Sequence, residues 1–228
     1  MSCKGTARTP SAKPSSFSNV FSQVAVLPPH FRYFCPMNSK ELTALATQVR
    51  RDIVRMVHAV QSGHPGGSLG CTDLLVQLYF DTMNINPDAF DMDGACEDVF
   101  FLSNGHISPV WYSVLARRGY FPVKELSTFR KLNSRLQGHP ATEEGLPGIR
   151  VASGSLGQGL SVALGAAQVK KLNGENTWVY SLHGDGELQE GQIWEAAMYA
   201  AHHKVDNILS FVDCNGQQIL SLIHISEP

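Results

Sequence analysis

The residues with the clearest chemical potential are an aspartate flanked by two glycines, Gly184-Asp185-Gly186, and an asparagine further along the chain, Asn215. A run of β-branched and aromatic residues typical of a strand precedes each of them. Carboxylate and amide oxygens are hard ligands, which suit Mg²⁺ or Ca²⁺ and do not suit zinc. A tight turn is the alternative interpretation of Gly-Asp-Gly, because both residue types tolerate positive φ. The surrounding elements decide between these interpretations.

The apolar periodicity alternates between helix and strand along most of the chain. This alternation predicts an α/β fold in which a parallel sheet carries helices on both faces. Ligands bind beyond the carboxyl ends of the strands in such a sheet. Asp185 and Asn215 are then expected to converge at one edge, where Gly186 can turn its backbone N–H toward a phosphate near a helix start. Helices are expected over 39–61, 73–83, 111–118, 124–132, 160–172 and 191–203, and strands over 99–103, 177–182 and 207–213.

The two ends of the chain differ in character from the rest. Residues 1–36 contain no Asp or Glu and are rich in serine, a composition typical of an organellar transit peptide or of translated leader sequence before a start at Met37. We expect this leader to be disordered and to lie outside the fold. Residues 220–228 follow a strand-and-turn pattern without a further element, so we interpret them as an aberrant or truncated tail. The folded domain is expected over 37–219.

The composition limits the classes of partner. A chain of 228 residues with 43% hydrophobic and 17% charged residues is typical of one globular domain with a full core. The net charge of −2 gives no electrostatic reason to expect nucleic acid or an anionic membrane as a partner. No apolar run is long enough to span a bilayer. We expect a cytoplasmic protein, or an imported one if the leader is a transit peptide.

Five sequence motifs occur in the order found in transketolases. Together they make the sequence resemble the thiamine-diphosphate-binding N-terminal domain of a transketolase, or the N-terminal subunit of a split transketolase. The motifs are "SGHPGG" (62–67), "LSNGHISP" (102–109), "QGHP" (137–140), "ASGSLGQGL" (152–160) and the stretch from Gly-Asp-Gly to asparagine (184–215).

The resemblance implies how the cofactor thiamine diphosphate and its metal ion are held. Asp185, Asn215 and the backbone carbonyl of Gln217 would coordinate Mg²⁺ or Ca²⁺. Gly186 would contact the diphosphate. The thiamine itself would be lined by Gly154 and Leu156.

The resemblance also implies roles for three histidines and a glutamate. His64, His106 and His139 would point into the substrate channel, where imidazoles can exchange protons near neutral pH and hydrogen-bond sugar hydroxyls. Each of these histidines lies beside a glycine or proline, and a solvated surface loop is the alternative interpretation of any one of them. Glu190 would belong to a carboxylate network that links two active sites across a dimer.

Transfer of a two-carbon ketol unit between sugar phosphates is the activity that the resemblance implies. In the family, the glutamate that activates the cofactor's aminopyrimidine lies on a second, pyrimidine-binding domain. We therefore expect a pyrimidine-binding partner chain or domain, self-association to a dimer or heterotetramer, and no activity without the partner. Two alternatives stay open: another thiamine-diphosphate enzyme such as a deoxyxylulose-phosphate synthase, which "SGHPGG" disfavours, and a non-catalytic truncated fragment.

Overall fold

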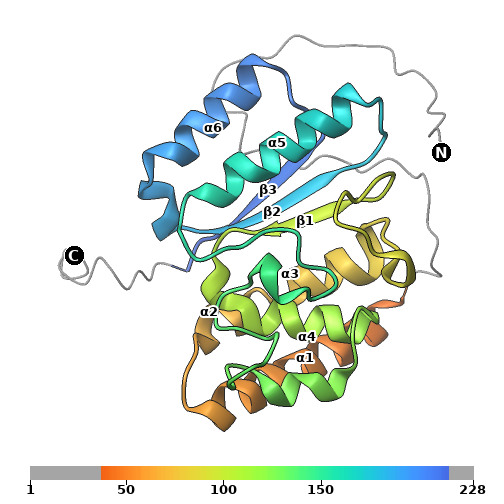
Figure 1. The fold of residues 1–228 in the computed structure, drawn as a ribbon, viewed down its shortest axis with the longest axis vertical. Helices are drawn as coiled ribbons and strands as arrows, with labels where there is room; N and C mark the ends of the chain where they lie inside the picture. The colour runs from red at the N-terminus through yellow and green to blue at the C-terminus, as the bar shows by residue number, and fades with distance from the viewer. Residues whose placement is uncertain (1–36, 216–228) are drawn as a thin grey trace.

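A computed structural model describes residues 37–215 of the chain (Figure 1). The leader 1–36, the tail 220–228 and Gln217 lie outside the described residues, so the predictions made for them stay predictions. No helix within 37–215 is long and apolar enough to cross a membrane.

Three parallel strands form the centre of the molecule in the order β1-β2-β3. They are β1(Val99–Leu102), β2(Val179–Gly184) and β3(Ile208–Asp213). The register places Leu102 opposite Leu182, and Leu182 opposite Phe211. The parallel sheet is therefore confirmed. The strand expected over 177–182 begins and ends two residues later, so Gly184 is its last residue and the turn starts at Asp185.

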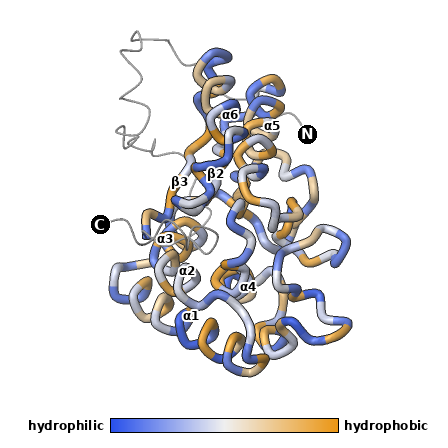
Figure 2. The backbone as a smooth tube through the Cα atoms, turned by 90° about the vertical axis from the view of Figure 1, so that its left-hand side faces the viewer, coloured by the Kyte–Doolittle hydropathy of each residue, from blue (hydrophilic) through white to orange (hydrophobic). Residues whose placement is uncertain are grey.

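Helices cover both faces of this sheet, as predicted (Figure 1). The first begins at an Asn38 cap, whose side chain accepts the backbone N–H of Glu41 while the Glu41 carboxylate accepts that of Asn38. In Figure 2 this helix alternates between hydrophilic and hydrophobic residues along its length, as expected of a helix with one buried side. The α-helices are α1(Ser39–Val60), α2(Pro65–Gly70), α3(Thr72–Gln77), α4(Ser108–Arg118), α5(Gln158–Leu172) and α6(Gly191–His202).

The alternation of side chains along β1 divides the core into two clusters. Phe100 and Leu102 pack into the larger cluster, with buried residues of α1, α3 and α4. Val99 and Phe101 point to the opposite face and pack with α5 and α6. All four residues are buried, which explains why this strand reads as an uninterrupted apolar run.

Three segments differ from the sequence predictions. Residues 124–132 were expected to form an α-helix but contain only the 3₁₀ segment Val123–Thr128, because the chain turns at Arg130 with a positive φ of 55°. Residues 62–70 lie between two of the expected helices and were assigned no element, but they contain α2, which starts at a proline suited to a first helical position. The helix that starts at Thr72 changes into a π-helical turn over Leu78–Thr82.

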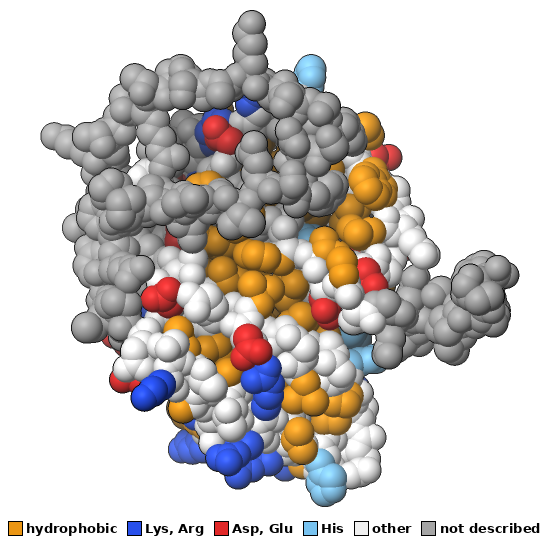
Figure 3. Space-filling model, turned by 180° about the vertical axis from the view of Figure 1, so that it is seen from behind, with side chains coloured by type: hydrophobic (Ala, Val, Ile, Leu, Met, Phe, Trp, Pro, Cys, Tyr) orange, Lys and Arg blue, Asp and Glu red, His pale blue; other side chains and the backbone are white. Residues whose placement is uncertain are grey.

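The rear face of the molecule has mixed chemistry. Figure 3 shows an apolar patch near its middle with acidic and basic side chains around it. The uncovered part of this face is therefore not a continuous basic surface, in agreement with the small net charge.

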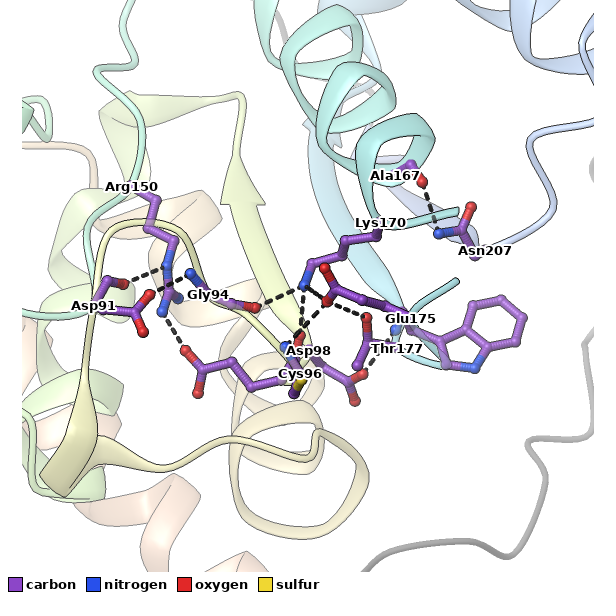
Figure 4. A network of polar contacts seen from close by, with 12 residues as sticks. Asp91, Gly94, Cys96, Asp98, Arg150, Ala167, Lys170, Glu175, Thr177 and Asn207 are labelled. Carbon is purple, nitrogen blue, oxygen red and sulfur yellow. Dashed lines mark hydrogen bonds and ion pairs between the residues drawn. The ribbon is translucent and has the colours of Figure 1, made fainter. Parts of the chain in front are cut away.

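A buried polar network joins the loop before β1 to the end of α5 (Figure 4). The Lys170 ammonium, in a residue only 4% exposed, donates to the carbonyl oxygens of Gly94 (2.7 Å) and Glu97 (3.0 Å) and to the Glu175 carboxylate (2.9 Å). Nearby, Asp98 accepts the backbone N–H of Trp178 at 2.7 Å. These bonds provide hydrogen-bond partners for polar groups of the long loop before β1, which has little secondary structure of its own.

We predict that Lys170→Met lowers the free energy of unfolding by about 3 kcal/mol, because it removes the ammonium that the Glu175 carboxylate and two carbonyl oxygens share, and leaves Glu175 with the Cys96 N–H as a donor. Urea unfolding measures the change. The matched control is Lys171→Met on the same helix, whose partner Asp206 is largely exposed; its cost should stay below about 1 kcal/mol. Equal effects of the two substitutions would contradict the structural importance of the network.

Candidate active site

The ends of the strands bring the predicted ligands to one edge of the sheet. Asp185 directly follows β2, and Asn215 lies two residues beyond β3. Gly184 is paired with Asp213, and the N–H of Asp185 donates to the Asp213 carbonyl at 3.2 Å. Asp185 and Asn215 are thus on neighbouring strand ends, as predicted. The Asp185 side chain accepts the N–H of Gly186 at 2.9 Å.

Asp213 links this edge to the segment that carries the first histidine motif. Its carboxylate accepts the side-chain amide of Asn215 at 2.9 Å and is hydrogen-bonded to the thiol of Cys71. Burial raises the pKa of the Cys71 thiol to about 12, and the Asp213 carboxylate acts in the same direction. Cys71 is therefore a protonated donor at neutral pH.

Glu187, which the sequence did not single out, is a carboxylate that is only 2% exposed and lies beneath this edge. It accepts the N–H of Gly157 at 2.7 Å, the N–H of Gly184 at 3.2 Å and the hydroxyl of Ser103. Ser103 in turn accepts the N–H of Gly159 at 3.2 Å. One carboxylate therefore joins the ends of β1 and β2 to the start of α5.

The charge on Glu187 is stabilised by these contacts. Burial pushes its pKa up, but the His183 ring, the Ser103 hydroxyl and the Gly157 N–H push it down further, and the net pKa is below its usual value. A carboxylate at the first turn of α5 also interacts favourably with the helix dipole. No local motif distinguishes Glu187 from an exposed turn residue, because its donors come from distant parts of the chain.

The glycine- and histidine-containing loops meet above the same edge. The rings of His64 and His106 lie with their centroids 5.0 Å apart. A Cβ atom on Gly154 would lie 3.3 Å from the His139 ring, and one on Gly105 would lie 3.0 Å from the Gly154 nitrogen. Four motifs that are distant in sequence are therefore in contact, and all three predicted histidines belong to them.

The environment keeps these histidines neutral. Burial lowers the pKa of His64, His106 and His139 below the ordinary value of 6.5. The positive charge of Arg130 lowers the pKa of His64 and His139 further. Those two histidines also lower the pKa of His106, against a smaller opposing effect of the Glu187 and Asp213 carboxylates. At neutral pH each ring can act as both a donor and an acceptor.

The remaining predicted residues lie around the loop that leads into α5. Leu156 is half-buried there, and the exposed Glu190 lies beside it at the start of α6: a Cβ atom on Gly157 would lie 2.8 Å from the Cβ of Glu190. Among the described residues, the buried Asn104 Oδ1 and Ser153 Oγ have no hydrogen-bond partner. Such atoms fit an edge that binds a polar ligand, and the oxygens of Asp185 and Asn215 fit a hard cation.

Comparison with known proteins agrees with this geometry. Residues 42–226 match the family described as "Transketolase, thiamine diphosphate binding domain". The chain belongs to this family. The resemblance found in the sequence is therefore confirmed, and the α/β fold is that of a transketolase thiamine-diphosphate-binding domain.

Individual relatives define how much of a transketolase the chain represents. One subunit of the apulose-4-phosphate transketolase of Actinobacillus succinogenes is 38% identical over 180 residues, which are 78% of this chain and 64% of that protein. The transketolase of Pongo abelii is 39% identical over 171 residues, 75% of this chain and 27% of that protein. The solved Leishmania mexicana transketolase has a TM-score of 0.72 at 30% identity, covering 80% of this chain and 28% of the other. The chain spans less than two thirds of each of these relatives.

We predict that the His106 ring titrates in NMR with a midpoint below 6.5, because burial and its histidine neighbours disfavour the imidazolium. The unfolded chain, with a histidine pKa of about 6.5, then binds more protons than the folded chain. The stabilising contribution of neutral His106 is present above pH 6.5 and is lost as the pH falls through the folded pKa. His106→Asn should flatten this loss in unfolding experiments, whereas a midpoint at or above 6.5 would contradict the packing described.

Proposed function

We propose that this chain is the thiamine-diphosphate-binding half of a transketolase, which transfers a two-carbon ketol unit between sugar phosphates together with a pyrimidine-binding partner chain. The observation that carries the proposal is the meeting of the Asp185 turn, the Asn215 strand end and the histidine loops at one edge of a parallel sheet. Ligands bind at this edge in open α/β sheets.

In this proposal, Asp185 and Asn215 hold Mg²⁺ or Ca²⁺ through their side-chain oxygens, and the backbone carbonyl of Gln217 completes the protein ligands. Gly186, whose N–H donates to the Asp185 side chain in this structure, contacts the diphosphate at the start of a helical turn. Gly154 and Leu156 line the thiamine. The bound cofactor supplies the electron sink that C–C bond cleavage requires.

The three histidines bind the sugar and move its protons. His64, His106 and His139 are neutral, so each can accept a proton from a sugar hydroxyl and return it later. Their loops are held against one another by close backbone approach at glycines, as at Gly154 and Gly105. This packing supports a fixed arrangement of the imidazoles around one substrate.

The names of similar proteins support the proposal of a complementary chain. The similar proteins of Actinobacillus succinogenes and Phocaeicola vulgatus are each named as one subunit of an apulose-4-phosphate transketolase, which implies a further subunit in those enzymes. We propose the same division here, with a dimer or heterotetramer in which Glu190 joins a carboxylate network between two active sites. We also propose a cytoplasmic location, where sugar phosphates are available.

We predict that Asp185→Ala abolishes Mg²⁺-dependent binding of thiamine diphosphate, because the diphosphate loses the cation that bridges it to the protein. Isothermal calorimetry at fixed Mg²⁺, with and without the chelator EDTA, measures the binding. Asp206→Ala, at an exposed aspartate before β3, is the control and should bind as the parent does. Unchanged cofactor affinity in Asp185→Ala would refute the assigned metal ligand.

We predict that the purified chain has no ketol-transfer activity by itself and gains it when mixed with a pyrimidine-binding transketolase subunit. In the reconstituted enzyme, His64→Ala should lower turnover about 10²- to 10⁴-fold, the usual contribution of a proton-transfer group, and should leave cofactor affinity nearly unchanged. His58→Ala, an exposed histidine near the end of α1, is the control. Turnover by the chain alone, with no partner detectable by mass spectrometry, would overturn the proposal that this chain needs a pyrimidine-binding partner.

A further inference from the structure

An asparagine can ligate a cation only through one end of its side chain. The amide oxygen is a hard acceptor, whereas the amide nitrogen carries two protons and repels a metal ion. The orientation of the Asn215 side chain therefore decides whether it can hold the cation of the proposed function. The group that accepts a hydrogen bond from the amide nitrogen sets that orientation.

In this structure the Asn215 nitrogen, Nδ2, donates to Oδ2 of Asp213 at 2.9 Å. An ionised carboxylate has only acceptor atoms, so it selects the nitrogen end of the amide and rejects the oxygen end. This leaves Oδ1 of Asn215 directed away from Asp213.

Asp213 is itself held in place from two sides. It is half-buried, its carboxylate is hydrogen-bonded to the Cys71 thiol, and a Cβ atom on Gly67 of α2 would lie 3.7 Å from its Oδ2. Its backbone carbonyl accepts the N–H of Asp185 at 3.2 Å. Asp213 therefore contacts both proposed metal-binding residues through different atoms.

We propose that Asp213 is a positioning residue: its carboxylate fixes the Asn215 amide with Oδ1 toward the cation and does not itself bind the ion. This inference rests on the proposed function, because it concerns the same cation site. Partners that orient a metal ligand in this way commonly change metal affinity about 10- to 100-fold when they are removed.

The first test measures the Mg²⁺ concentration that gives half-maximal thiamine diphosphate binding to the full chain. Asp213→Ala should raise this concentration about 10- to 100-fold. Asp213→Asn should recover most of the loss, because its amide oxygen can still accept the Asn215 nitrogen. Asp206→Ala is the matched control and should leave the value unchanged. An Asp213→Ala value equal to that of the parent overturns the proposal.

The same substitution made in an Asn215→Asp variant distinguishes a positioning role of Asp213 from direct metal ligation. The two oxygens of a carboxylate are equivalent, so in Asn215→Asp the side chain needs no orienting partner. In that background Asp213→Ala should lower Mg²⁺ affinity much less than it does beside Asn215, because only the through-space attraction of one carboxylate for the cation is lost. If Asp213 were a ligand, its removal would weaken Mg²⁺ binding by the same factor in both backgrounds, and that result would contradict the proposal.

A third measurement needs no cofactor. The Asn215 side-chain amide protons, observed by ¹⁵N NMR of the chain without Mg²⁺, should lose their hydrogen-bonded shift in Asp213→Ala and keep it in Asp213→Asn. Unchanged shifts in Asp213→Ala overturn the proposal regardless of cofactor binding. If the shifts change as expected but Asp185→Ala binds cofactor like the parent, then the positioning contact is real and the cation assignment of the proposed function fails.

Discussion

Parallel pairing of the three strands is the constraint on which the site depends. With Leu102, Leu182 and Phe211 in register, the chain leaves β1, β2 and β3 at one edge of the sheet. A slip of one residue would exchange the two buried faces of each strand. Both faces are covered by different helix sets, so the core itself fixes which residues reach the edge.

The second requirement is the buried charge of Glu187. An ionised carboxylate in a core is stable only when its oxygens are hydrogen-bonded, and here two glycine N–H groups and a serine hydroxyl provide those bonds. The same bonds hold the loop before α5 against the Gly-Asp-Gly turn. Stability and site geometry are therefore coupled: the donors that stabilise the Glu187 charge include the backbone of the loops that would surround the cofactor.

The sequence was sufficient to predict the positions of those site residues that lie at strand ends and in glycine-rich loops. Asp185 and Asn215 could be placed together because strand alternation implies a shared edge. Glu187 could not be found, because its importance arises from Ser103 and Gly157, which are far away in sequence. Residues 124–132 were wrongly expected to be an α-helix, because their propensity did not reveal the positive φ at Arg130. The roles of the individual site residues stay predictions.

The central claim is that a cation between the ends of β2 and β3 anchors the cofactor diphosphate. The most direct test is a crystal structure of the chain with thiamine diphosphate and Mn²⁺, with anomalous scattering collected to locate the metal. We predict one anomalous peak within coordination distance, about 2.0–2.6 Å, of oxygens from Asp185 and Asn215. A cofactor bound elsewhere, or a peak with neither residue as its ligand, would contradict the account.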